Sequence, residues 1–537
     1  MFPVNLATAL DKAKLRPVSR ALTLDKTAAR HWLRLLLLLT LLLRLLLLPG
    51  FIDSGDGVFF VRGVRHYATY ELSPHWPGYP VYIWAGQLFH LLAPDPVLAL
   101  HLLAALATSL SIWPLALFTE SICREAGRPE KQAYLAGLSA GLAWALLPLS
   151  WQAGAQINSD ALALPVALLL LWCCRQALRA EGRTGFWLAS LALLSGLLPG
   201  IRLSYVALLG PVLHVLWARR GWRSGRLPAW LILPGAFLAS GLWLGWQWLM
   251  EGTRFLEAGE RHLAGHYQSW GGSLLTDPDP LTRPFRLFYL LAVYGLGGWW
   301  PQEGLPLSRL PLSLLLTALT GIGLYRLIKS IKTTGCKLLL LWLLPYLLWV
   351  LVSHDLNIAR YCLPLVAGLS IVLGLALGSL TRFYLPALLG LLLVLVPVSL
   401  PLALEYRASP PPGERLAAYL NAQPEPSRTA LLMLEKRTSP VDFLAYFVAE
   451  RAPATRQVWT TEADFDTRLQ ALTAEGFTVY TALSSPAALS ETAGDWILAT
   501  ELNQTSLMDS LTDLTGSNRL WVYRYYPPGW LRFQRPD

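Results

Sequence analysis

The sequence predicts a polytopic α-helical membrane protein of about 11 spans that ends in a small α/β domain. Of its 537 residues, 54% are hydrophobic and 15% are charged, whereas a soluble domain carries about 25% charged residues. Apolar runs close to the length of a membrane-spanning helix recur between residues 32 and 402. After residue 405 the chain becomes polar, and strand-like segments alternate with helix-like ones.

The basic residues orient the predicted spans. Lys and Arg side chains recur from Lys12 to Arg34, which predicts an uncleaved cytoplasmic tail over residues 1–31. A transmembrane domain then covers residues 32–405, and an odd number of spans places the α/β domain of residues 406–537 on the extracytoplasmic face. The net charge of +10 is attributed to cytoplasmic loops beside the lipid bilayer. No nucleic-acid motif is present in the sequence, so no nucleic-acid partner is expected.

Successive apolar runs define the spans, and basic loops follow them on one side. We predict spans over residues 32–49, 96–119, 133–150, 160–177, 186–199, 203–218, 229–249, 310–327, 338–352, 361–379 and 384–402. Residues 80–93 are predicted to form an amphipathic helix at the membrane surface. Residues 286–300 are predicted to form a re-entrant or interfacial helix, because a crossing there would place the basic segment 328–337 outside.

The C-terminal region has the pattern of a small α/β domain. "RTALLMLE" (428–435) and "FTVYTAL" (477–483) read as strands, while "PVDFLAYFVAE" (440–450) and "FDTRLQALTAE" (465–475) read as helices. The Pro-rich link at 407–414 is typical of a semi-rigid spacer. The sequence shows no internal repeat, which gives an inverted-repeat transporter no support.

Polar side chains gather at the predicted extracytoplasmic ends of the spans. Groups of this kind are costly in contact with lipid, so their position predicts a polar cavity with a function. The candidates are Asp53, Asp56, His75, Tyr79, Asn158, Asp160, Arg202, His354, Arg360 and Tyr361.

Several candidates also have a purely structural interpretation. Asp53 and Asp56 can be solvated loop residues or helix caps, and Asp160 can cap the span that begins there. The two arginines can be anchors at the membrane interface, and His354 can be a solvated loop histidine.

Four short motifs, in this order, resemble the GT-C superfamily of membrane glycosyltransferases. They are "DGVFF" (56–60), "HWPGYP" (75–80), "GIRLSY" (200–205) and "ARYCLPLVAGL" (359–369). Within that superfamily they resemble the bacterial branch of protein O-mannosyltransferases and aminoarabinose transferases, over roughly residues 30–405. The chain departs from the mannosyltransferase pattern where Gly57 follows Asp56 in place of Glu, and where Trp76 replaces the first Pro of the second motif.

The resemblance implies an inverting enzyme that takes a sugar from a polyprenyl-phosphate donor. Asp56 then aligns with the family's acid and serves as the base that deprotonates an acceptor hydroxyl, with Asp53 as the alternative. Arg360 and Arg202 are expected to bind the donor phosphate, with His354 as a weaker third partner. No cofactor is required; Asp53 and Asp56 could hold a divalent metal, but we do not favour one.

Other functions remain open at this stage. An O-antigen-ligase-like enzyme would carry its key residues in a late external loop, whereas the acids here come first. A transporter would place ionisable residues within the spans, where Arg44 is the clearest example. A third alternative is a membrane scaffold for the external domain. The acceptor can be a protein, a lipid or a glycan, and the expected location is the bacterial inner membrane.

Overall fold

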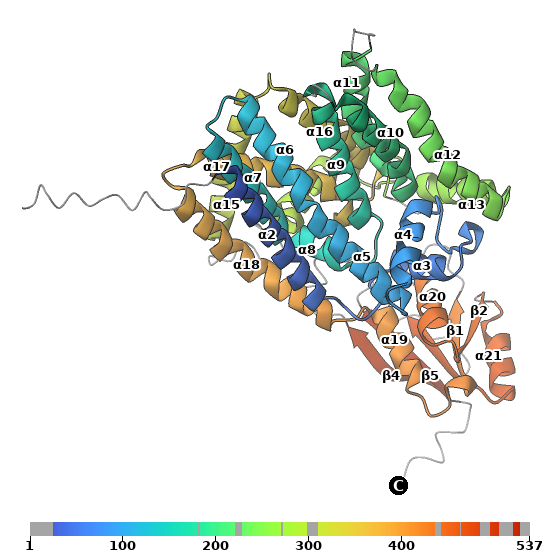
Figure 1. Cartoon of the computed structure of the whole chain (residues 1–537). Coiled ribbons are helices and arrows are strands. Elements are labelled where there is room, and N and C mark those ends of the chain that lie inside the picture. Colours follow the sequence, from blue (N-terminus) through green and yellow to red (C-terminus); the bar gives the residue numbers. More distant parts are fainter. Residues whose placement is uncertain are drawn as a thin grey trace, which may run out of the picture.

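The computed structural model describes most of the chain as a helical body joined to a C-terminal α/β unit (Figure 1). The described residues are 25–179, 183–220, 228–269, 272–297, 310–434, 442–461, 463–483, 495–503 and 519–526. The predicted N-terminal tail up to residue 24 and the last residues of the segment 286–300 lie outside this set.

The helical body contains the long apolar helices and the short helices that connect them. In chain order these are α2 (Lys26–Leu46), α3 (Gly55–Arg65), α4 (Pro80–His90), α5 (Pro96–Leu110), α6 (Ile112–Glu125), α7 (Glu130–Leu146), α8 (Pro148–Ala155), α9 (Asp160–Arg179), α10 (Thr184–Ile201), η3 (Leu203–Leu209), α11 (Gly210–Ala218), α12 (Ile232–Glu251), α13 (Arg254–Ala264), α14 (Arg283–Tyr289), α15 (Leu310–Lys329), α16 (Thr334–Ser353), η9 (Ala359–Cys362), α17 (Leu363–Ser379) and α18 (Tyr384–Ala408).

Every predicted span falls on one helix or on two consecutive helices, but the predicted number of spans is not confirmed. Within the described residues, seven helices are long and apolar enough to cross a membrane, or eight if the bent pair α7 and α8 forms one span. Helices α2, α15 and the stretch Leu203–Ala218 occupy predicted positions without belonging to those seven. The predicted interfacial helix at 80–93 corresponds to α4, and α14 with the following short π-helix η7 (Leu290–Gly295) covers most of the described part of the segment 286–300.

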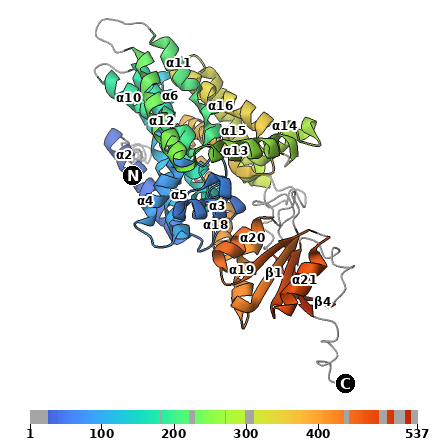
Figure 2. The ribbon, with the colours of Figure 1, turned by 90° about the vertical axis from the view of Figure 1, so that its right-hand side faces the viewer.

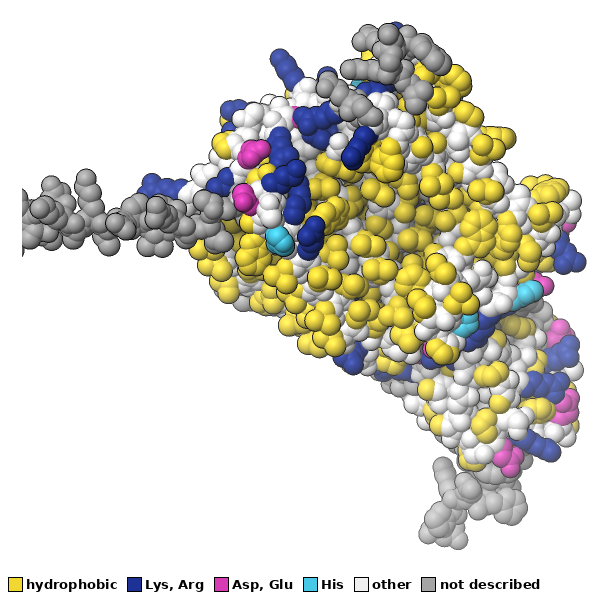
Figure 3. Space-filling model, viewed as in Figure 1, with side chains coloured by type: hydrophobic (Ala, Val, Ile, Leu, Met, Phe, Trp, Pro, Cys, Tyr) yellow, Lys and Arg dark blue, Asp and Glu magenta, His cyan; other side chains and the backbone are white. Residues whose placement is uncertain are grey.

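Helix α17 lies at the centre of the helical body and packs against α7. Small residues allow this close approach: a Cβ atom at Gly374 would lie 2.6 Å from the Cβ atom of Ala140. Helices α2, α12 and α18 instead present many leucines outward. Figure 3 shows hydrophobic side chains over the face formed by α2, α5 and α18, as expected for a surface in contact with lipid.

The α/β unit is a five-stranded sheet flanked by three helices. Its strands are β1 (Thr429–Leu434), β2 (Arg456–Thr460), β3 (Thr478–Leu483), β4 (Asp495–Asn503) and β5 (Arg519–Tyr526), in the order β2-β1-β3-β5-β4. Strand β1 pairs in parallel with β2 and β3, while β5 is antiparallel to β3 and β4. Helices α19 (Pro412–Asn421) and α20 (Asp442–Arg451) pack together near α3, and α21 (Phe465–Ala474) packs against β1 and β3 (Figures 1 and 2).

Candidate active site

Helix α3 places Asp56 beside an arginine that is 304 residues distant in the sequence. Ser54 caps the helix by accepting a hydrogen bond from the backbone N–H of Gly57 at 3.1 Å. Asp56 therefore lies in the first helical turn, where the helix dipole favours a carboxylate. Nη2 of Arg360, from the short helix η9 before α17, donates to Oδ2 of Asp56.

A second ion pair lies directly behind the first. Nε of Arg202 lies 3.2 Å from Oδ1 of Asp160, and Nε of Arg360 lies 3.8 Å from Oδ2 of the same carboxylate. Arg202 also donates to Oγ of Ser159 at 3.2 Å. Asp56, Arg360, Asp160 and Arg202 thus form a row of alternating charges, which we call the charge cluster.

Exposure falls steadily along the charge cluster. The side chain of Asp56 is 26% exposed and that of Arg360 is 12% exposed, whereas Arg202 is 7% exposed and Asp160 is fully buried. A molecule that reaches the cluster from outside therefore meets Asp56 and Arg360 first. Asp160 is placed to hold both arginines in position, because its two oxygens face one guanidinium each.

Aromatic side chains surround the two arginines. The ring of Tyr361 lies 5.2 Å from the guanidinium carbon of Arg202 and 5.3 Å from that of Arg360. The imidazole of His354 stacks on Tyr361 at 4.2 Å between ring centroids. Tyr361 thereby lies in contact with both guanidinium groups and restricts their position.

His75 and Tyr79 complete the outer side of the site. Nδ1 of His75 lies 3.9 Å from Oδ1 of Asp56, and its Nε2 lies 3.0 Å from the hydroxyl of Tyr79. The ring of His75 also stacks on His262 of α13, with 5.9 Å between centroids. The sequence did not single out His262, because α13 falls in a long polar segment without a recognisable motif.

Burial and the arginines set the ionisation of the groups outside the spans. Burial opposes the charge on Asp56, but the attraction of Arg360 outweighs this cost and holds the pKa of Asp56 below its usual value. Burial lowers the pKa of His75, takes that of His354 well below its usual value, and lowers that of His262 to about 4. The site thus combines a carboxylate with neutral imidazoles near pH 7.

Asp53 lies apart from Asp56 despite being three residues away. Its Oδ1 accepts from the backbone N–H of Ile157 at 3.0 Å, and its Oδ2 accepts from the hydroxyl of Tyr406 at 2.9 Å. Burial raises the pKa of Asp53 above its usual value. Among the described residues, no group of three or more His, Cys, Asp or Glu side chains is arranged to hold a metal ion.

Asn158, and not Asp160, takes the capping role at the start of α9. The side-chain oxygen of Asn158 accepts from the backbone N–H of Ala161 at 2.9 Å. This leaves the carboxylate of Asp160 available for the arginines, so the capping interpretation considered for Asp160 does not hold.

The α/β unit contacts the segment just before helix α3 and the C-terminal end of that helix. Oε1 of Glu414, in α19, accepts from the backbone N–H of Ile52 at 2.8 Å and lies 3.0 Å from Nε of Arg451. At the far end of α3, Arg65 pairs with Glu450 of α20. The predicted spacer is shorter than expected: α18 runs to Ala408 and α19 begins at Pro412, so Glu414 lies within a helix and is buried.

Replacing Glu414 with Ala is expected to destabilise the joint between the two parts of the chain. The change removes the acceptor for Ile52 and leaves Arg451 without its carboxylate, which costs about 1–3 kcal/mol for a buried group of this kind. Thermal unfolding in detergent should show a lower midpoint than in wild type. The exposed Glu425→Ala is the matched control, and an equal midpoint for both variants would contradict a role of Glu414 in the joint.

Comparison with known proteins agrees with the motifs. Residues 67–224 match the family described as the N-terminal domain of the protein O-mannosyl-transferase TMEM260. No curated protein sequence matches the chain. Among solved structures, ArnT from Cupriavidus metallidurans bound to undecaprenyl phosphate aligns with a TM-score of 0.56 and 14% identity, over 93% of this chain and 98% of ArnT.

Two further structures give related matches. The apo state of the same ArnT aligns with a TM-score of 0.52 and 15% identity, over 93% of this chain and 98% of ArnT. The Archaeoglobus fulgidus oligosaccharyltransferase tethered with an acceptor peptide aligns with a TM-score of 0.44 and 12% identity, over 84% of this chain and 69% of the other. The resemblance to GT-C membrane glycosyltransferases is therefore confirmed, and this chain has the GT-C fold.

Proposed function

We propose that this protein transfers a sugar from a polyprenyl-phosphate donor to an acceptor hydroxyl at the extracytoplasmic surface of the membrane. The observation that carries the proposal is the charge cluster, in which the most exposed carboxylate is paired with the most exposed arginine. The ArnT structure with undecaprenyl phosphate supports the choice of a polyprenyl-phosphate donor. The family match at residues 67–224 supports a transferase that acts on a hydroxyl.

In this proposal three members of the charge cluster take part in the reaction. The acceptor oxygen attacks the anomeric carbon while Asp56 removes its proton. The bond between that carbon and the phosphate oxygen breaks, and its electron pair remains on the departing polyprenyl phosphate. Arg360 and Arg202 stabilise this charge as it develops, and attack opposite to the leaving group inverts the anomeric centre.

The pairing of Asp56 with Arg360 links the proposed base to the proposed phosphate-binding group. A donor phosphate competes with Asp56 for the same guanidinium, because Arg360 is the outermost cation of the cluster. Once Arg360 turns toward the phosphate, less positive charge faces Asp56. The pKa of Asp56 then rises, and the carboxylate becomes a stronger base when the donor is in place.

The proposal is tested by transfer of radiolabelled sugar from a panel of polyprenyl-phosphate sugars by the purified protein. Protein hydroxyls, lipids and glycans are supplied as acceptors, and donor hydrolysis is followed in parallel. Transfer or hydrolysis with at least one donor is the expected result. Binding of every donor without turnover, with all three acceptor classes present, would contradict a transferase.

The pH profile of donor turnover gives a second prediction. Because the pKa of Asp56 is held below its usual value, the base stays deprotonated in mild acid, and kcat/KM should fall only at a pH lower than that at which an ordinary Asp titrates. In Arg360→Gln the opposing effect of burial remains while the attraction is lost, so the acidic limb should move to higher pH. An acidic limb at the same pH in both proteins would contradict Asp56 as the titrating group.

A further inference from the structure

A buried arginine without a carboxylate partner lies near the C-terminal end of α2. Arg44 is 2% exposed and donates through Nη2 to Oγ of Ser150 at 2.7 Å. Its Nε and Nη1 have no hydrogen-bond partner among the described residues, and no described carboxylate forms an ion pair with it. A guanidinium buried in this way is costly unless an anion compensates its charge.

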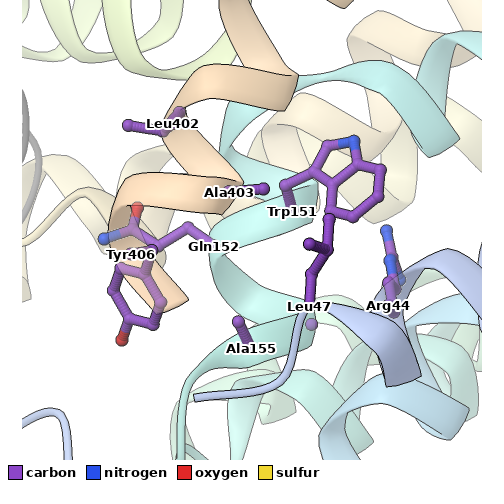
Figure 4. Close-up of a pocket in the computed structure, with 9 residues that line it drawn as sticks. Arg44, Leu47, Trp151, Gln152, Ala155, Leu402, Ala403 and Tyr406 are labelled. Atoms are coloured by element: carbon purple, nitrogen blue, oxygen red, sulfur yellow. The ribbon is translucent and has the colours of Figure 1, made fainter. Parts of the chain in front are cut away.

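A pocket lies directly beside this guanidinium. It is lined by Arg44 and Leu47 from the α2 end, Trp151 and Gln152 from α8, and Ala403 and Tyr406 from α18 (Figure 4). The empty space measures about 400 Å³, including the open region at its mouth. The enclosed space admits about one water-sized group, so a larger group has to contact it from the open side.

The surroundings of the pocket favour an anion that belongs to a lipid. Helices α2 and α18 contribute to its lining, and Leu42, Leu46, Leu400 and Leu404 of these helices are exposed. Figure 3 shows that the face formed by these helices is largely hydrophobic. A second cation, Arg407, follows the lining residue Tyr406 in the chain; it is exposed and donates to the backbone carbonyl of Leu46 at 2.7 Å. A free inorganic anion gains nothing from the leucines, whereas a lipid phosphate brings its own acyl chains to them.

We propose that Arg44 binds the phosphate group of an anionic phospholipid whose acyl chains lie against α2 and α18. This site is separate from the charge cluster, and the proposal does not depend on the transferase proposed above. Tyr406 connects the two regions, because it lines the pocket and donates to Asp53. A lipid bound here therefore packs behind Asp53 and the loop that leads to Asp160.

Native mass spectrometry with phosphatidylglycerol tests this site on the full chain. Wild type is expected to bind one phosphatidylglycerol molecule about tenfold or more tightly than Arg44→Gln, because a charge-assisted hydrogen bond to phosphate is lost. Arg382→Gln is the matched control, since Arg382 is exposed elsewhere and contributes the same charge. It should bind the lipid as wild type does.

Two further variants and two further ligands test whether the lipid binds at Arg44. Ala403→Phe fills the pocket without altering Arg44 and should weaken the same binding event, even if Arg44→Gln fails to fold. Arg44→Lys should retain part of it. Diacylglycerol, which lacks the phosphate, should not occupy the site. Equal lipid binding by wild type, Arg44→Gln and Ala403→Phe would overturn the proposal, as would displacement of the lipid by millimolar inorganic phosphate.

Discussion

Replacing Asp56 with Asn should lower sugar transfer by about 100- to 10,000-fold, the contribution expected from a general base. Asn keeps the shape of the side chain but cannot accept the proton of the acceptor hydroxyl. Donor binding should not weaken, because Arg360 loses its competing carboxylate and becomes free for the phosphate. The measurement is transfer of labelled sugar together with donor affinity, so that a large loss in kcat is separated from any change in KM.

Asp53→Asn is the matched control for Asp56→Asn. Asp53 is held by Ile157 and Tyr406, away from Arg360, so its amide variant should affect folding stability more than turnover. Both variants must first give the same elution volume and a cooperative thermal transition. If Asp53→Asn abolishes transfer while Asp56→Asn stays active and folded, the assignment of the base to Asp56 is wrong.

The long helices of the helical body could be predicted from the sequence because they contain apolar runs about as long as a membrane span. Each predicted span falls on one helix or on two consecutive helices, and both predicted strands and both predicted helices of the C-terminal region are present. Strands β2 (Arg456–Thr460), β4 and β5 and helix α19 were not predicted, and the three strands carry no clear alternation of polar and apolar residues. The number of spans depends on marginal helices such as α2, in which three arginines interrupt the apolar run.

The sequence identified most members of the site but not their pairing. The predicted membrane topology placed Asp56, Asp160, Arg202 and Arg360 at the extracytoplasmic ends of the spans. In the structure these four side chains lie together. The residues around Asp53 did not predict its hydrogen bond with Tyr406, because the two residues are 353 positions apart in the sequence. The contact of Glu414 could not be predicted either. Its partner is the backbone N–H of Ile52, and a backbone group does not depend on which residue carries it.

Arg360→Gln should lower kcat by about 100- to 1,000-fold, comparable to the loss of one preorganised group that stabilises transition-state charge. Arg360 faces two carboxylates and a tyrosine ring, and it is the outermost cation of the charge cluster. Its removal leaves the departing phosphate with Arg202 alone. Donor affinity should fall as well, since the phosphate already carries charge in the ground state. Kinetics at varied donor concentration measures both effects.

Arg360→Lys separates the charge of this residue from its shape. Lys retains the positive charge but lacks the planar fork that reaches Asp56 and Asp160 together, so we expect activity between wild type and Arg360→Gln. The exposed Arg382→Gln removes the same charge far from the cluster and should leave kcat unchanged. Full activity of Arg360→Gln would mean that Arg202, and not Arg360, binds the donor phosphate. Full activity of Arg360→Lys with inactive Arg360→Gln would instead show that charge alone, without bidentate geometry, stabilises the leaving group.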